Sequence, residues 1–172
     1  LGIDAKFYLT CPVPYRIASL VGSTPMVFHV PQQHFNAVVV VDCASLLRTG
    51  DESEQLVKVG DKIICIDHHF SNEPFGDYLY VEGNRASTAE IIYDLLKLLD
   101  VKITREIANL AYAGLSDDTG CFRYSNANKA AFECAASLVE DGARPHDVAN
   151  ALYFSMPTAV LRLRARALSK LR

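Results

Sequence analysis

Two short apolar runs dominate the first half of the chain, and each ends in an aspartate. The runs are NAVVVVD, ending at Asp42, and KIICID, ending at Asp67. A continuous run of valine and isoleucine predicts a strand buried on both faces of a parallel sheet. A single aspartate after a strand commonly caps a helix or begins a turn. Two such acids favour a ligand site instead, because open α/β sheets bind ligands beyond the carboxyl ends of their strands.

The remaining pattern predicts an α/β fold, a parallel sheet flanked by helices with a helical C-terminal part. Residues 3–10 alternate as a short strand does, residues 11–16 contain two prolines and form a connector, and residues 77–83 form a more polar strand nearer an edge. Helices are expected over 87–99, 104–115, 128–142, 145–153 and 157–172. The first opens with Ser87 and Glu90 at the spacing of a capping box.

The bulk composition excludes some function classes. The chain has 172 residues, half of them hydrophobic, which suits one globular domain. No apolar run is long enough to span a bilayer, so we expect no membrane segment. The formal net charge of -3 argues against binding along duplex nucleic acid. Five scattered cysteines without a C-x-x-C pair indicate free thiols in a reducing cytoplasm.

Charge divides the chain into an acidic body and a basic tail. Residues 157–172 hold five of the 17 lysines and arginines and no acid. The other 12 basic residues share residues 1–156 with all 20 acidic ones. An amphipathic helix that packs on its own domain is the simplest interpretation of this tail.

His68 and His69 follow the second strand directly, and a third acidic group lies further on. Adjacent side chains of an extended chain point to opposite sides, so we expect one histidine to ligate a metal and the other to contact substrate. Asp117 and Asp118, in LSDDTG, are expected in a tight turn after a helix. Alone, that turn is weak evidence for catalysis, but beside Asp42 it adds a further carboxylate.

Carboxylate and imidazole ligands without thiolate suit Mn²⁺ or Mg²⁺, with Zn²⁺ as an alternative. Such a cluster serves phosphoester hydrolysis, in which two cations about 3.5–4 Å apart neutralise the charge that develops on phosphate. Asp42 is the candidate for a carboxylate that bridges both ions. A dinucleotide-binding site does not fit, because no G-x-G-x-x-G follows a strand.

These motifs, in this order, resemble the DHH phosphoesterase superfamily, to which the RecJ-like exonucleases belong. The matching pieces are VVVVDCA, the signature DHH at 67–69 followed by SNEPFGD, ASTAEIIYDLL and GLSDDTGCFRYSN. The chain looks most like the bifunctional oligoribonuclease and pAp phosphatase (nanoRNase) branch. The resemblance implies a Mn²⁺-dependent or Mg²⁺-dependent enzyme that hydrolyses short single-stranded oligonucleotides or nucleotide phosphates such as pAp.

The resemblance also implies residue roles. Asp42 would bridge two metal ions in the intact protein, His68 would ligate one of them, and Asp118 would complete that site, with Asp117 as its rival. His69 would be the catalytic residue that contacts the scissile phosphate.

Asp67 would play a supporting part in the same site. Its expected role is to orient a neighbouring histidine or backbone group.

Two family features are missing from the sequence. The opening motif H-x-x-P-D-x-D-x-x-G-S, which supplies further metal ligands, does not occur, and neither does the glycine-rich C-terminal (DHHA1) domain. We therefore expect residues 1–156 to be a partial DHH domain, inactive or nearly so alone, and residues 157–172 to be a connector helix toward that absent domain.

Other interpretations stay open at this point. They are a non-catalytic DHH-like binding module, a manganese-dependent inorganic pyrophosphatase and a cyclic dinucleotide phosphodiesterase. A pyrophosphatase would need a strongly basic pocket, toward which Arg123 and Lys129 offer little. Self-association into a homodimer is also considered, through the tail helix.

Overall fold

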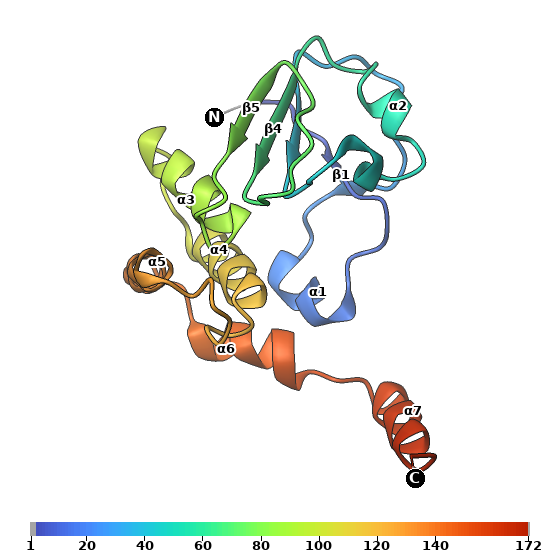
Figure 1. The fold of residues 1–172 in the computed structure, drawn as a ribbon, viewed down its shortest axis with the longest axis vertical. Helices are drawn as coiled ribbons and strands as arrows, with labels where there is room; N and C mark the ends of the chain where they lie inside the picture. The colour runs from blue at the N-terminus through green and yellow to red at the C-terminus, as the bar shows by residue number, and fades with distance from the viewer. Residues whose placement is uncertain (1–2, 172) are drawn as a thin grey trace.

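The computed structural model describes residues 3–171, and a three-stranded parallel sheet lies toward one end of the molecule (Figure 1). The strands β3 (Val38–Val41), β4 (Ile63–Asp67) and β5 (Tyr78–Val81) lie in the order β3-β4-β5. The parallel α/β fold is thus confirmed, with β5 at an edge. Val41 pairs with Ile66 in the register, so β3 and β4 end side by side, and Asp42 and Asp67 both lie where the carboxyl ends of the strands leave the sheet.

A second, smaller sheet precedes this one. It pairs β1 (Phe7–Tyr8) with β2 (Met26–Val27) in parallel, and α1 (Tyr15–Val21) lies between them. Only two residues of the segment 3–10 are therefore in a strand. The predicted connector at 11–16 runs into α1, which sequence patterns did not indicate because the helix is short and has no side-chain cap.

The second half of the chain is helical, as predicted. Its helices are α3 (Thr88–Leu98), α4 (Arg105–Asp118), α5 (Lys129–Glu140), α6 (Pro145–Ala149) and α7 (Thr158–Leu168), with a π-helical segment η2 (Asn150–Phe154) after α6. A 3₁₀ turn η1 (Leu46–Thr49) and the short α2 (Ser53–Leu56) connect β3 to β4.

Side-chain caps fix where three of these helices begin. Ser87, Thr104 and Asn128 precede α3, α4 and α5, and each side chain accepts a hydrogen bond from the backbone N–H three residues on. Such caps satisfy donors that a helix end leaves without a partner. Of the predicted capping box, the Ser87 half is confirmed, whereas the Glu90 side chain accepts from the N–H of Ala86 and not from that of Ser87.

The core lies in two main regions. One lies among α3, α4 and α5 and includes the fully buried Leu115 and Leu138. The other lies on one face of the sheet, where Val40 and Ile63 pack with Leu56 of α2. The sheet and the helical core meet at the strand ends, where α3 contacts β4.

The opposite face of the sheet corrects a prediction. Val40 is 7 % exposed, whereas Val39 and Val41 are 53 % and 44 % exposed, so β3 is not buried on both faces. Tyr78 and Tyr80 of β5 share that open face and are about half exposed. The run of valines suits burial on two faces, but over β3 the described chain covers only one; on the other face Ile66 of β4 is buried, whereas Val39 and Val41 are not.

The last helix stands apart from the rest of the molecule (Figure 1). α7 has no buried residue, and an extended link separates it from η2, so the prediction that this helix packs on its own domain was wrong. Within residues 3–171, none of the helices combines the length and the apolar character that a membrane crossing requires.

The two faces of β3 give a matched pair of substitutions. We expect Val40→Ala to lower the free energy of unfolding by about 2 kcal/mol, because it leaves a cavity against α2. Val39→Ala removes the same atoms from the open face and should lower it by less than about 1 kcal/mol. Urea unfolding followed by circular dichroism measures both; equal losses would mean that the open face is covered in solution.

Candidate metal centre

Asp42 stands at the carboxyl end of β3 in a left-handed backbone conformation. Its φ is 56°, a region that aspartate enters more readily than most residues, and its N–H donates to the carbonyl of Ile66 at 3.0 Å. Thr88, the first residue of α3, donates its hydroxyl to Asp42 Oδ1 at 2.9 Å. The sheet and the start of α3 therefore both position this carboxylate.

His68 follows β4 and faces two carboxylates. Its Nδ1 lies 3.2 Å from the carbonyl oxygen of Arg85, and because a carbonyl only accepts, Nδ1 carries the proton. Its Nε2 lies 3.5 Å from Asp42 Oδ1 and 3.7 Å from Asp118 Oδ2. Nε2 thus points at the two acids, as the ligating nitrogen of a metal-bound histidine would.

The two rival acids, Asp117 and Asp118, differ in what they contact. They lie in the last turn of α4 and not in a turn after the helix, which corrects that prediction. Asp117 points away to Arg16 of α1, whose two guanidinium nitrogens donate to its oxygens at 3.3 and 3.2 Å. Asp118 faces His68, so the structure brings Asp118 into the cluster and Asp117 beside it.

His69 lies beside His68 and not opposite to it. The two ring centroids are 4.7 Å apart. The expectation of opposite directions was wrong because the chain leaves the extended conformation after β4 and turns, with Asn72 N–H donating to the carbonyl of His69 at 3.1 Å. His69 Nδ1 lies 2.7 Å from Asp67 Oδ1, the contact expected of Asp67 with a neighbouring histidine.

Asp67 is fully buried and is held by two partners. Besides His69, the amide nitrogen of Asn72 donates to its Oδ2 at 2.7 Å. Burial raises the pKa of Asp67, but the hydrogen bonds from His69, Asn72 and the His68 N–H outweigh it and hold that pKa below its ordinary value. Asp67 is therefore ionised and accepts a hydrogen bond from His69 Nδ1–H, which leaves His69 Nε2 free.

Three residues that position the site were not found from sequence. Thr88 holds Asp42, Asn72 holds Asp67 and the carbonyl of Cys43, and the amide nitrogen of Asn126 donates to the carbonyl of Asp118 at 3.1 Å. All three lie within motifs that carry the family resemblance, but polar residues in turns have too many local uses for sequence alone to assign these partners.

The electrostatics of the cluster favour a cation. Burial raises the pKa of Asp118 to about 6, and the negative charges of Asp42 and Asp117 add to the rise, whereas His68 lowers it. The position of Asp118 at the negative end of α4 acts in the same direction. Two carboxylates whose charges repel one another gain free energy when a divalent ion binds between them.

The donor set fits a hard or borderline divalent ion. One ligand atom each from Asp42, His68 and His69 lies within 4.8 Å of the other two. Asp118 adds a carboxylate oxygen next to His68. Oxygen and imidazole donors without thiolate match Mn²⁺ and Mg²⁺ better than they match a structural zinc site.

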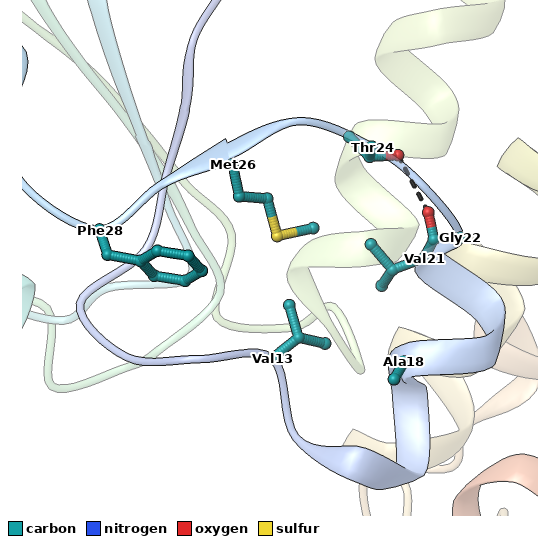
Figure 2. Close-up of a pocket in the computed structure, with 7 residues that line it drawn as sticks. All are labelled: Val13, Ala18, Val21, Gly22, Thr24, Met26 and Phe28. Atoms are coloured by element: carbon teal, nitrogen blue, oxygen red, sulfur yellow. Dashed lines mark hydrogen bonds between the residues drawn. The ribbon is translucent and has the colours of Figure 1, made fainter.

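An apolar pocket elsewhere shares no residue with this cluster. It has a volume of about 240 Å³ and opens between α1 and β2, where Val13, Met26 and Phe28 converge (Figure 2). Its walls carry no charged side chain, so it lacks the carboxylate and imidazole groups that the cluster at the strand ends presents.

Comparison with known proteins decides the family. Residues 7–115, more than half of the chain, match the family described as the DHH family, N-terminal domain. The chain belongs to the DHH family. The matched region contains Asp42, His68 and His69 and ends three residues before Asp118.

Curated relatives point to one branch of the DHH family. The chain is 36% identical over 113 residues to the bifunctional oligoribonuclease and PAP phosphatase NrnA of Thermus thermophilus, covering 66% of this chain and 35% of that protein. It is 34% identical over 119 residues to the NrnA of Bacillus subtilis, covering 67% and 37%. The resemblance to the nanoRNase branch is thus confirmed, and the chain spans about a third of the length of these relatives.

Solved structures show the same fold. An exopolyphosphatase-related protein from Bacteroides fragilis superposes with a TM-score of 0.84 at 21% identity, covering 96% of this chain and 52% of that one. A candidate family II inorganic pyrophosphatase from Methanococcus jannaschii gives a TM-score of 0.57 at 18% identity, covering 80% and 48%.

The pKa of Asp118 makes the free energy of unfolding depend on pH. Between the ordinary 3.8 and about 6, the folded chain retains a proton that the unfolded chain has lost, so stability falls as pH rises through this window. Asp118→Asn should remove this contribution. At about pH 7.5, without metal, we expect that variant to be more stable by about 1–2 kcal/mol, after allowance for the partial exposure of the carboxylate.

Urea unfolding over a pH series measures this effect, with Asp117→Asn as the matched control. Asp117 is exposed and paired with Arg16, so its loss should change stability by less than about 1 kcal/mol. An Asp118→Asn variant less stable than the parent chain at neutral pH would contradict the charge repulsion inferred at the cluster.

Proposed function

We propose that this chain forms the metal-binding part of a phosphoesterase that hydrolyses short single-stranded oligonucleotides or nucleotide phosphates such as pAp. The observation that carries the proposal is the convergence of Asp42, His68 and Asp118 at one edge of the sheet. Their donor chemistry, the DHH family and the names of the NrnA relatives support it. The proposal concerns the whole protein, because the chain spans about a third of those relatives.

Mn²⁺ is the proposed cofactor, with Mg²⁺ as an alternative and two ions in the intact protein. The ions would neutralise charge on the phosphate and lower the pKa of a bound water. Asp42 would bridge them, since its carboxylate has a second oxygen beside the one that Thr88 contacts. His68 would ligate one ion through Nε2, and Asp118 would complete that site.

His69 is the proposed contact to the scissile phosphate. Asp67 accepts a hydrogen bond from His69 Nδ1–H, so Nε2 is left available and, when protonated, can donate to a phosphate oxygen. Asn72 fixes Asp67 in turn. This arrangement gives His69 one defined orientation without using a residue of the metal cluster.

A pyrophosphatase is the less favoured alternative. Among the described residues near the cluster, Arg16 is paired with Asp117, and Arg123 donates its Nε to the carbonyl of Gly120 at 2.6 Å. A site for two phosphates needs several cations free to bind them. Two alternatives remain, a non-catalytic module and a cyclic dinucleotide phosphodiesterase. Hydrolysis assays on a panel of substrates distinguish them from the proposed function.

We further propose that residues 1–156 are the DHH part and that residues 157–172 form a connector helix. The absence of buried side chains in α7 and its arginines, Arg162, Arg164 and Arg166, support a helix that serves another domain or subunit. All five cysteines are free thiols, which supports the cytoplasm as the location. Self-association through α7 stays a prediction.

Calorimetric titration with Mn²⁺ tests the metal site. We expect the chain to bind Mn²⁺, and His68→Ala to weaken binding at least tenfold, because it removes the ligand between the two acids. His146→Ala is the matched control, since His146 is an exposed imidazole bonded to Asn150 outside the cluster. Equal binding by the parent chain and His68→Ala would overturn the assignment.

A hydrolysis assay on the same preparations and on the full-length protein separates the activities. The panel is a short RNA oligonucleotide, pAp, a cyclic dinucleotide and inorganic pyrophosphate, each with Mn²⁺. Turnover of the first two by the full-length protein, lost in its Asp42→Asn variant, is expected. Turnover of pyrophosphate alone would favour the pyrophosphatase, and Mn²⁺ binding without turnover of any substrate by the full-length protein would favour the non-catalytic module.

A further inference from the structure

The peptide unit that joins Arg85 to Ala86 makes a hydrogen bond at each end. Its carbonyl oxygen accepts from His68 Nδ1 at 3.2 Å. Its N–H donates to Glu90 Oε2 at 3.0 Å. A single rigid amide therefore lies between the histidine of the metal cluster and a carboxylate on α3.

Glu90 is 1 % exposed, and its charge has a partner. Arg85 donates from Nη1 to Glu90 Oε1 at 2.8 Å, and the same guanidinium contacts Glu82 at 3.1 Å and Asp94 at 2.7 Å. The guanidinium on one oxygen offsets part of the cost of burying this carboxylate. Its other oxygen is committed to the N–H of Ala86.

This geometry departs from an ordinary capping box. There, the glutamate at the third helical position bonds the N–H of the N-cap residue itself. Here Ser87 is the N-cap and accepts from the Glu90 N–H at 3.2 Å, but the Glu90 side chain reaches one residue further back, to Ala86. A capping box does not require the Glu90 side chain to extend to Ala86, whereas a hydrogen bond to the Arg85–Ala86 peptide does.

We propose that Glu90 is a positioning residue for His68 and acts through the Arg85–Ala86 peptide. A carboxylate on the N–H polarises the amide and makes its carbonyl a stronger acceptor. The carbonyl then keeps the proton of His68 on Nδ1 and directs the lone pair of Nε2 toward Asp42 and Asp118. Metal-binding histidines commonly take such support from a carboxylate or a carbonyl directly; here the two act in series.

A second contact ties the same segment to the third ligand. The amide nitrogen of Asn126 donates to the carbonyl of Ala86 at 3.0 Å and to the carbonyl of Asp118 at 3.1 Å. Residues 85–86 therefore link the position of His68 to the end of α4. The metal part of this inference rests on the proposed function, but the choice of tautomer does not.

The test uses the side-chain ¹⁵N resonances of His68 in the metal-free chain, at a pH where the imidazole is neutral. The parent chain should show the tautomer protonated on Nδ1. In Glu90→Gln, we expect a several-fold rise in the tautomer protonated on Nε2. Mn²⁺ affinity measured by calorimetry should fall about tenfold or more.

Tyr93→Phe is the matched control. Tyr93 lies on the same helix and is also buried, and the phenylalanine variant loses a hydroxyl that donates to Asp141 at 2.6 Å and not to the Arg85–Ala86 peptide. It should lower the thermal midpoint without changing the tautomer or the Mn²⁺ affinity. If Tyr93→Phe matched the losses of Glu90→Gln, or if Glu90→Gln changed neither readout, the proposal would be overturned.

The two readouts separate this inference from the proposed function. If the parent chain did not bind Mn²⁺, the proposed function would fail, and the tautomer would still decide the role of Glu90. If circular dichroism showed Glu90→Gln to be unfolded, Glu90→Asp would replace it. That variant keeps the charge opposite Arg85 but is too short to hold both partners, so the same change in tautomer is expected, and an unchanged tautomer would overturn the proposal.

Discussion

The parallel pairing of β3 with β4 is the constraint on which the site depends. Val41 lies opposite Ile66, and the Asp42 N–H continues the ladder to the carbonyl of Ile66. Asp42 and His68 therefore leave the sheet at the same edge and within reach of each other. A slip of one residue would reverse which side chains face the core, so the buried Val40 and Ile63 fix the register and, with it, the geometry of the cluster.

Some buried or half-buried acidic side chains of the fold are paired with an arginine, whereas those of the candidate metal site are not. Arg16 neutralises Asp117, and Arg85 neutralises Glu90. Within residues 3–171, Asp42 and Asp118 form no ion pair with a lysine or an arginine; His68 lies between them, and neutral donors hold the Asp42 side chain and the Asp118 carbonyl. A neutral donor fixes an acid in place without cancelling its charge, so the negative potential is retained where a cation would bind.

The sequence revealed residues whose position follows from local pattern. Strand ends and a capping box are local features, so Asp42, Asp67 and the start of α3 could be placed before the structure was known. The hydrogen-bond partners of the site residues could not be predicted in this way. Thr88 contacts Asp42 at a sequence separation of 46 residues, and Asn126 contacts Ala86 at a separation of 40. Only tertiary packing brings together residues so far apart in the chain. The open face of β3 was missed for the same reason, since four valines alone do not tell which neighbours cover them.

Two asparagines hold this geometry, and each does so at a cost to the free energy of unfolding. Asn72 and Asn126 each donate to two groups that can only accept, so the orientation of both amides is unambiguous. In each, the buried Oδ1 has no hydrogen-bond partner among the described residues. An unsatisfied buried oxygen costs about 1–3 kcal/mol. An aliphatic side chain would remove that oxygen, but it would also remove the donor to the buried Asp67 or to the carbonyl of Asp118, so these amides position the site and satisfy buried acceptors at the same time.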